Sequence, residues 1–488
     1  MTAKSFLSSA ILFFLSVLFF SFAHPGFVFP SGFALFGWFS YIPVFMLIRR
    51  SSVRSAILWG AAYGFFRFFV LLFWLFGYNE AGLLGISLAM AGETALIFLL
   101  CAFLQKKIPA FSWFLMPQVM LLFEFLRTTG ELGFSYGVIG YSQWQVIPLI
   151  ASARFFGVWG ISFVIMLFGS VVADWLFSHN VRQLRSFSLR DTKKVFFFIA
   201  IFFFLILCGL FPRSAPENKK SLSIALIQPN SDPWKDGVDA YQDELNELIR
   251  LTDTALKEHP ETQLVVWSET AFVPDIVRHY TERKDASRYR LSKKLLSYID
   301  KKNCAFVLGN NHQERTAAGE NEYNSALFFE PKKNVIPPRP VVYNKMRLVP
   351  FSEQIPYPRL LSPFARLFGE DSHYWARGEE LTVFEADDIR FCTPICFEDT
   401  FPQHVKKMRK AGADLIVNLS NDSWSHSLAC QNQHLSMAVF RSVENNVPTI
   451  RSTASGQTCV IDSHGRITAM AEPFTATYLF ATVKIGEK

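Results

Sequence analysis

The sequence has little charge and few cysteines for its length. Only 18% of its 488 residues are Asp, Glu, Lys or Arg, while 50% are hydrophobic. So much apolar surface excludes an intrinsically disordered chain. Seven cysteines are too few to indicate a disulfide scaffold. We find no Gly-rich phosphate loop and no Cys/His spacing typical of zinc sites, so we expect neither a metal nor a cofactor.

The few charges are unevenly distributed along the chain. Residues 1–211 contain 14 of the 48 Lys and Arg but only 6 of the 41 Asp and Glu. The excess positive charge therefore belongs to an apolar segment and does not describe a basic soluble domain. Nucleic acid, which binds exposed basic surfaces, is a poor candidate partner.

Seven long apolar stretches dominate residues 1–211. A helix needs about 20 such residues to cross a membrane. Buried core helices of a soluble protein are the alternative, but seven in succession favour a membrane domain of about seven transmembrane helices. The sixth stretch is longer than one span needs, so part of it is expected to be a loop or an interfacial helix. The stretches are Phe6–Ala23, Phe27–Ile48, Ala56–Phe76, Gly82–Leu104, Ala110–Leu126, Val146–Phe177 and Val195–Phe211.

The cations between the stretches predict an orientation. Lys and Arg are enriched in cytoplasmic loops, and here they lie before the first stretch and in every second joint after it. The other joints, around His24, Asn79 and residues 128–145, contain neither. We therefore expect a cytoplasmic amino terminus and an extracytoplasmic location for everything after residue 211. We expect the first stretch to be an uncleaved anchor.

Several ionisable residues lie within the apolar stretches, among them Arg67, Glu93, Glu124 and Arg154. A charge in lipid is costly, so these side chains should face the bundle interior or an interface. Pairing between helices and contact with a headgroup or substrate are both compatible with the sequence.

Residues 222–488 have the pattern of a soluble α/β domain, which a polar linker at residues 212–221 joins to the membrane domain. Short apolar strands alternate with amphipathic helices, as in layered α/β sheets. The predicted elements that carry the argument are the strands Leu222–Gln228, Leu264–Trp267, Cys304–Gly309, Ser325–Phe329 and Ile389–Ile395 and the helices Pro402–Ala411 and Asn432–Asn445.

Three motifs place reactive side chains near predicted strands. Glu269 follows an apolar strand, at the end where ligand sites of α/β sheets collect. Lys345 lies among apolar residues, where a partly desolvated ammonium would stabilise negative charge. Cys396 ends an apolar strand before a helix, whose amino terminus would favour a nucleophilic thiolate. Taken singly, the first two could also be solvated loop residues, and Cys396 a structural thiol like Cys392.

Together the motifs resemble the nitrilase, or carbon–nitrogen hydrolase, superfamily, which uses a Glu–Lys–Cys triad in this chain order. The similarity covers about residues 222–485 and includes Asn418–Trp424, Gln433–Asn445, Arg451 and Gly456. It implies a four-layer α-β-β-α sandwich, whereas periodicity alone predicts only an α/β domain. Combined with the apolar first half, the chain is similar to the apolipoprotein N-acyltransferase family of the bacterial inner membrane.

This resemblance implies an enzyme of lipoprotein maturation. Such an acyltransferase moves an acyl chain from a phospholipid, through a cysteine thioester, to the α-amino group of the N-terminal diacylglyceryl-cysteine of an apolipoprotein. The implied partners are the phospholipid donor, the diacylated acceptor and the bilayer, and the implied location of the catalytic domain is periplasmic.

Carried over residue by residue, the resemblance makes Cys396 the nucleophile, Glu269 the general base and Lys345 the oxyanion stabiliser. It also implies auxiliary or substrate-binding roles for Glu353, Glu398, Trp234 and Trp424. The chain departs from the family at Phe397, where Tyr is usual, after Trp424, where Phe-Gly is usual, and at Ala454–Gly456, where Asn-Thr-Gly is usual. The family's eighth span is not visible either.

Two other functions share these features. A membrane-tethered, nitrilase-type amidohydrolase acting on a small amide would use the same triad, with the spans as an anchor. A receptor or transporter would use the second domain only to bind a ligand. The intact triad argues against a receptor or transporter, and a transporter should also show a pair of broken helices.

Overall fold

The structure is a computed structural model that describes residues 3–178, 188–211, 220–231, 236–316, 319–359 and 374–486. The chain forms two compact units. The helical unit comprises Met1–Phe211 together with Ser427–Phe440, and the sheet unit comprises Pro212–His426 together with Arg441–Lys488. The linker expected at residues 212–221 lies mostly outside the described residues and stays a prediction.

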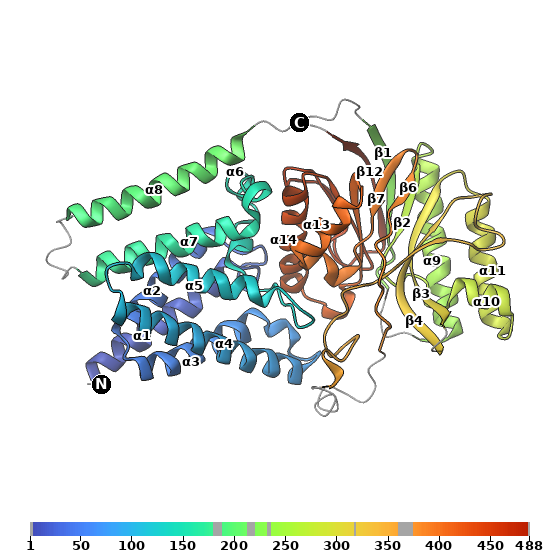
Figure 1. Cartoon of the computed structure of the whole chain (residues 1–488). Coiled ribbons are helices and arrows are strands. Elements are labelled where there is room, and N and C mark those ends of the chain that lie inside the picture. Colours follow the sequence, from blue (N-terminus) through green and yellow to red (C-terminus); the bar gives the residue numbers. More distant parts are fainter. Residues whose placement is uncertain are drawn as a thin grey trace. The chain divides into compact units, whose positions relative to one another are not determined.

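Each of the seven apolar stretches coincides with a long helix of the helical unit (Figure 1). The sixth stretch is divided, as expected: the short helix α6 (Ile147–Ile150) precedes the long one. The long helices are α1 (Ala3–Ala23), α2 (Ala34–Arg50), α3 (Val53–Leu71), α4 (Glu80–Lys107), α5 (Ser112–Arg127), α7 (Ala153–Ser178) and α8 (Leu189–Leu210).

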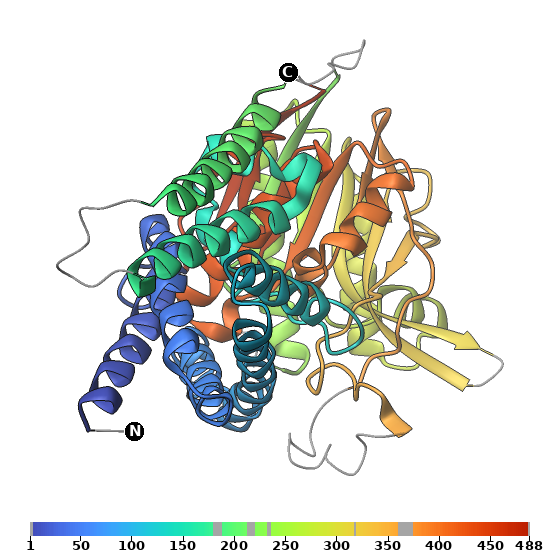
Figure 2. The ribbon, with the colours of Figure 1, turned by 60° about the vertical axis from the view of Figure 1, so that its left-hand side comes forward.

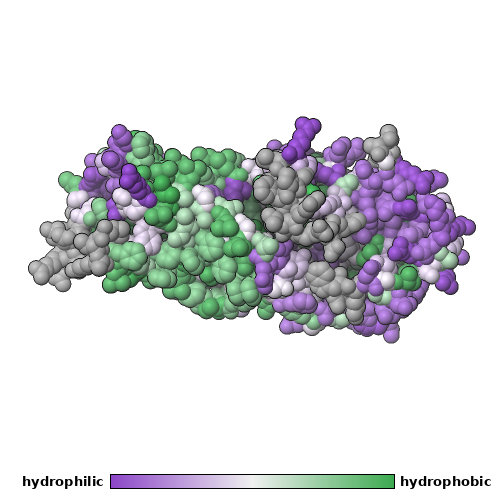
Figure 3. All heavy atoms as spheres, turned by 90° about the horizontal axis from the view of Figure 1, so that it is seen from below, coloured by the Kyte–Doolittle hydropathy of each residue, from purple (hydrophilic) through white to green (hydrophobic). Residues whose placement is uncertain are grey.

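Four of these helices, α1, α4, α7 and α8, are long and apolar enough to cross a membrane. Seven spans therefore stay a prediction, because α2 and α5 have only 17 and 16 residues, and α3, with 19 residues, contains Arg54 and Arg67. Only 17% of the apolar window of α8 is buried. Figure 3 shows hydrophobic residues over much of the visible face of the helical unit. Apolar surface of this extent indicates contact with lipid.

The ionisable residues inside the helical unit contact other helices and backbone groups. Arg127 on α5 forms an ion pair of 3.5 Å with Glu93 on α4. Glu124 on α5 accepts a hydrogen bond of 3.4 Å from the Tyr41 hydroxyl on α2. Arg154 donates to the carbonyl of Phe211 at 2.7 Å. These contacts favour pairing between helices over contact with a headgroup.

The first part of α14 (Leu428–Asn445) belongs to the helical unit. There the amide of Gln433 donates to the backbone carbonyls of Pro25 and Leu71, at 2.8 and 2.9 Å. Its Oε1 accepts from Trp74 Nε1 at 3.0 Å. One buried amide thus satisfies a loop carbonyl, the carbonyl at the end of α3 and an indole N–H, which fixes this part of α14 within the helical unit.

The sheet unit contains two six-stranded sheets. The first has the order β12-β1-β2-β3-β4-β5 and the second β11-β10-β9-β8-β7-β6. The first is built from β1 (Lys220–Gln228), β2 (Leu264–Trp267), β3 (Ala305–Thr316), β4 (Gly319–Phe329), β5 (Val341–Asn344) and β12 (Thr477–Ile485). The second is built from β6 (Phe384–Ala386), β7 (Ile389–Cys392), β8 (Leu415–Ser420), β9 (Thr449–Thr453), β10 (Cys459–Ile461) and β11 (Ile467–Met470).

Helices cover the outer faces of both sheets (Figures 1 and 2). The first sheet is covered by α9 (Val238–Glu258), α10 (Ile276–Glu282) and α11 (Ala286–Asp300), and the second by α13 (Pro402–Lys410) and the end of α14. The four-layer sandwich implied by the resemblance is confirmed.

Strand alternation explains the layering. In β1, Leu222, Ile224 and Leu226 belong to the core between the two sheets. Ala225 and Ile227, which follow Ile224 and Leu226, belong to the core under α9 and α11. Because successive side chains of a strand point to opposite faces, a run of apolar residues serves both cores.

The predicted strand Ile389–Ile395 is wrong at its end, because β7 stops at Cys392. Pro394 has no N–H to donate to a ladder, and beyond it Ile395 makes only an isolated bridge to Leu419. The chain therefore leaves the sheet before the predicted nucleophile.

Candidate functional site

The ends of three strands in the sheet unit bring the predicted triad together. Glu269 lies two residues after β2, Lys345 directly follows β5, and Cys396 lies four residues after β7. Lys345 Nζ is 3.1 Å from Glu269 Oε1 and 2.8 Å from Glu353 Oε1. The charges of both Glu269 and Lys345 act on the Cys396 thiol. Residues far apart in the sequence thus form one cluster at the strand ends.

A glycine on the neighbouring strand permits the position of Glu269. A Cβ atom on Gly309 of β3 would lie 2.6 Å from the Glu269 Cα and 2.4 Å from the Thr270 nitrogen. No side chain fits this approach, because the neighbours are backbone atoms. The turn is also tight, since Thr270 has a φ of 48°.

Both oxygens of the Glu269 carboxylate have fixed partners. Oε1 accepts from Asn324 Nδ2 at 2.8 Å in addition to Lys345, and Oε2 accepts from the Asn421 backbone N–H at 2.9 Å. Burial raises the pKa of Glu269, and the charge of Glu353 raises this pKa further. A carboxylate with a raised pKa is better suited to accept a proton.

Lys345 is an ammonium held between two carboxylates. Its side chain has no exposed surface. Burial acts to lower its pKa, but Glu269 and Glu353 outweigh burial and raise the pKa well above the usual value. Glu353 is itself held by the Val349 backbone N–H at 2.8 Å. The charge is therefore permanent and its position is fixed.

Cys396 begins a short 3₁₀ turn, η5 (Cys396–Thr400), with a φ of 48°. This left-handed conformation is strained for a residue other than glycine. Burial raises the pKa of the thiol, and the charge of Glu269 raises it further, while Lys345 lowers it. The α-helix expected directly after Cys396 begins only at Pro402, as α13, and the short turn η5 lies between the thiol and that helix. The resting group is a thiol that needs a base.

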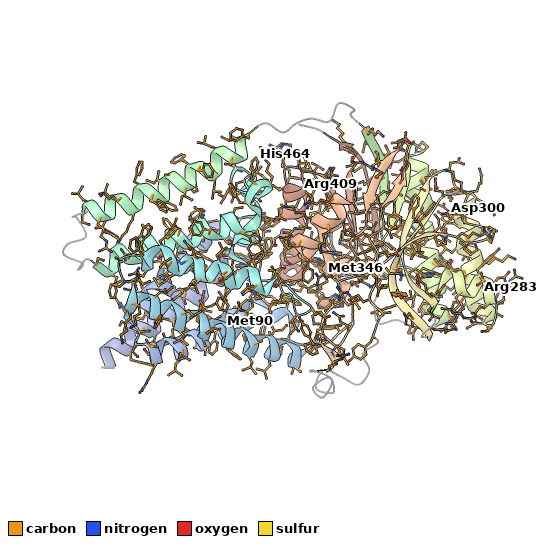
Figure 4. The ribbon with its side chains drawn as sticks, viewed as in Figure 1. Met90, Arg283, Asp300, Met346, Arg409 and His464 are labelled. Carbon is orange, nitrogen blue, oxygen red and sulfur yellow. The ribbon has the colours of Figure 1, made fainter. Side chains whose placement is uncertain are left out.

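Glu398 links the lysine segment to the nucleophile turn. Its Oε1 accepts from the backbone N–H groups of Met346 and Arg347, at 2.7 and 2.9 Å. Its Oε2 accepts from the Ile395 N–H at 2.8 Å. Figure 4 labels Met346, the residue after the triad lysine. One buried carboxylate therefore ties the chain next to Lys345 to the chain next to the nucleophile.

Two side chains that the sequence analysis missed complete this link. The Tyr343 hydroxyl donates to Glu398 at 2.8 Å, and His404 Nε2 lies 3.2 Å from the same carboxylate. Burial alone would raise the pKa of Glu398, but His404 and the Ile395 N–H lower it below the usual value. Glu398 is thus a stable anion that accepts hydrogen bonds from two segments of the site.

A second buried ion cluster lies beside the nucleophile turn. Arg451 on β9 forms ion pairs with Asp399, in η5, and with Asp422, in the loop after β8. None of these side chains is more than 3% exposed. The cluster joins the turn that carries Cys396 to the loop whose N–H group binds Glu269.

The structure describes some of the remaining predicted residues but not all of them. Trp234 lies outside the described residues. Trp424 lies in the short turn η6 (Ser423–Ser425) and is partly buried. The ring of Phe397 packs against that of Phe401, with 5.0 Å between the centroids, so this position is apolar here.

Asn324 is the contact of the triad that sequence reasoning missed most clearly. It lies on β4 on the same face as Ala326 and Phe328, outside the strand predicted from Ser325. Extending the alternation two residues toward the amino terminus would have placed its amide at the site.

In the part of the chain that the structure describes, no group of His, Cys, Asp and Glu could hold a metal ion.

Comparison with known proteins identifies the family of the chain. The carbon–nitrogen hydrolase family model matches residues 223–487, and the model of the apolipoprotein N-acyltransferase N-terminal domain matches residues 7–171. Apolipoprotein N-acyltransferase 1 of Treponema denticola is 37% identical to this chain, and the alignment covers 96% of this chain and 89% of that protein. The protein of that name from Treponema pallidum is 39% identical, covering 99% and 91%.

Among solved structures, Saccharomyces cerevisiae Nit3, a member of branch 10 of the nitrilase superfamily, is 18% identical with a TM-score of 0.39. The match covers 54% of this chain and 90% of that one. The sequence relatives and both family models lead to the same conclusion: this chain belongs to the apolipoprotein N-acyltransferase family, whose carbon–nitrogen hydrolase domain here carries the Glu269–Lys345–Cys396 cluster.

Proposed function

We propose that this protein transfers an acyl chain from a membrane phospholipid to the α-amino group of the N-terminal diacylglyceryl-cysteine of an apolipoprotein. The transfer proceeds through a thioester on Cys396. The observation that carries the proposal is the contact of the buried Lys345 with Glu269, with the charges of both acting on the Cys396 thiol. This set contains a base, a cation and a nucleophile, which acyl transfer requires.

In the first step the thiol attacks the ester carbonyl of the phospholipid. Glu269 accepts the thiol proton as the carbon–sulfur bond forms. Lys345 uses two of its three N–H groups for Glu269 and Glu353, so the third can stabilise the oxyanion. When the carbon–oxygen bond breaks, the protonated Glu269 returns the proton to the departing lysophospholipid.

In the second step the α-amino group of the acceptor attacks the thioester. Glu269 takes a proton from the amine, an amide bond forms, and the carbon–sulfur bond breaks. The proton then returns to the sulfur, which restores the thiol. Because the Cys396 pKa is raised, the thiol is the stable resting form and the cycle closes without an external reactant.

The apolar helices support a lipid-facing reaction. We propose a location in the bacterial inner membrane with a cytoplasmic amino terminus and an extracytoplasmic catalytic domain at residues 222–488. The support is the distribution of cations between the apolar stretches. Both substrates are lipid-anchored, so confinement to one membrane raises the concentration of each at the site.

A product assay separates this function from that of an amidohydrolase. The purified protein is given a phospholipid with a labelled acyl chain, with and without a diacylglyceryl-cysteine peptide. We expect labelled peptide in proportion to donor consumed, and at most one labelled chain per protein when the acceptor is omitted. Continuous release of free fatty acid without acceptor would contradict the proposal and favour hydrolysis.

A further inference from the structure

A polar cavity of about 320 Å³ lies in the sheet unit, apart from the triad. Its wall includes α10, the start of α11 and part of β3 and β4. The volume falls in the range of ligand sites. Figure 4 labels Arg283, which lies between two residues of the wall, Glu282 and Lys284. The triad mechanism uses no residue of this wall.

The register of β3 and β4 connects the cavity to the triad. Asn311 pairs with Asn324, and Gln313 pairs with Glu322. Opposed residues and residues two apart on a strand share one face. Asn311, Gln313 and Glu322 line the cavity, while Asn324 donates to Glu269. The cavity therefore begins at Asn311, directly opposite the partner of Glu269, and continues along the ribbon to Gln313 and Glu322.

The charges of the wall exclude an acyl chain as the ligand, because burying them against hydrocarbon would cost several kcal/mol. They do not suit a simple anion either, since acidic and basic groups alternate around the wall. The acidic groups are Asp275, Glu282, Asp285 and Glu322, and the basic groups are Arg278, Lys284 and Arg288.

Two amide oxygens of the wall need hydrogen-bond donors. Asn311 Oδ1 and Gln313 Oε1 are buried and have no hydrogen-bond partner within the described residues. The terminal torsion of an amide side chain is soft, so either oxygen can turn toward a ligand. A peptide backbone offers both N–H donors and carbonyl acceptors, whereas a phosphodiester offers no donor. The wall therefore matches an extended peptide.

We propose that this cavity binds the polypeptide that follows the modified cysteine of the acceptor. The inference rests on the proposed function, which places the α-amino group of that cysteine at Cys396. An extended chain advances about 3.3–3.6 Å per residue, so residues a few positions after the modified cysteine would enter the cavity.

The test compares two acceptors in the full-length protein. One is a diacylglyceryl-cysteine followed by a single residue, and the other is followed by six residues. We expect the long acceptor to have the lower KM. In Gln313→Ala and in Arg288→Ala, the ratio of the short-acceptor KM to the long-acceptor KM should fall about fivefold, as loss of one hydrogen bond of roughly 1 kcal/mol requires. The matched control, Arg290→Ala, changes an exposed arginine of α11 outside the wall.

Several results would overturn the inference. Equal KM values for the two acceptors in the unaltered protein would do so, as would variants that behave like Arg290→Ala. Slower thioester formation from phospholipid in the variants would instead assign the cavity to a lipid headgroup. Thioester formation is measured in the same preparations, so its absence would mark a failure of the proposed function rather than of the acceptor site.

Discussion

At the scale of single residues, the Lys345 ammonium lies between two carboxyl groups that have different surroundings. Glu269 and Glu353 both contact Lys345, at 3.1 and 2.8 Å. Glu353 is also bound by the backbone N–H of Val349, whereas the charge of Glu269 acts on the Cys396 thiol. In the proposed mechanism, the same cation therefore has a positioning carboxylate on one side and a proton acceptor on the other.

This division predicts the pH dependence of thioester formation. Glu269 must be ionised to accept the thiol proton, and its pKa is raised above 4.5 by burial and by Glu353. As pH falls through this raised pKa, Glu269 becomes protonated and the rate falls. We expect the acid limb of the pH–rate profile, measured by single-turnover acylation, to have its midpoint above pH 4.5.

The variant Glu353→Gln tests the cause of that shift. Removing the like charge beside Glu269 should move the midpoint of the acid limb to lower pH. A midpoint at or below 4.5 in the unaltered protein would remove Glu269 from the role of base, and an unchanged midpoint in Glu353→Gln would show that Glu353 does not cause the shift.

The sequence identifies residues of the site unevenly. Glu269, Lys345 and Cys396 can be found because each carries a reactive group next to an apolar strand. Asn324 can be found only by extending the alternation of its strand into a polar hairpin, and His404 cannot be found, because a histidine on a surface-like helix has no distinctive local pattern. Their contacts with Glu269 and Glu398 depend on how the strands meet in space.

At the scale of elements, one carboxylate holds two segments of the site together. Glu398 accepts hydrogen bonds from the backbone N–H groups of two segments. One segment contains Lys345 and follows β5, and the other directly precedes the turn η5. The alignment of ammonium and thiol therefore depends on an anion that is buried in the sheet unit and forms no part of the triad.

Glu398→Gln should destabilise the sheet unit by about 3 kcal/mol at neutral pH, since a buried anion loses its charge-assisted hydrogen bonds. The folded-state pKa of Glu398 is lowered, so its ionisation stabilises the protein above the unfolded pKa, and this stabilisation is lost as pH falls through the folded pKa. The difference in melting temperature between the variant and the unaltered protein should therefore be largest near pH 7 and narrow below about pH 4.

Glu385→Gln, on the exposed side of β6, is the matched control and should leave the melting temperature unchanged. A loss of stability in Glu398→Gln that persists undiminished at low pH would show that shape, and not charge, links the two segments.

Helices and strands, like single residues, are predicted where their own local sequence is distinctive. The strand Leu264–Trp267 is predicted to the residue because it is apolar and bounded by polar residues, and the helix Pro402–Ala411 is predicted to within one residue because a proline starts it. The polar ends of β3 and β4, the four-residue β5 and the helix α10 are not predicted, since pairing with neighbours, rather than composition, makes them regular.

The whole molecule combines an apolar helical unit with a sheet unit whose visible face is largely hydrophilic (Figure 3). The uneven distribution of charge predicts this two-part character. That Ser427–Phe440 belongs to the helical unit cannot be predicted, because its contacts join residues more than 350 positions apart in the chain. The amide of Gln433 makes such contacts through groups that any polar helix could carry.

The measurement that tests the central claim most directly is the intact mass of the whole protein after incubation with phospholipid and no acceptor. The account predicts a mass increase of one acyl chain that hydroxylamine removes, as expected for a thioester. It predicts no increase in Cys396→Ala and a normal increase in Cys392→Ala, which alters the buried cysteine of β7. Acylation that persists in Cys396→Ala would contradict the account.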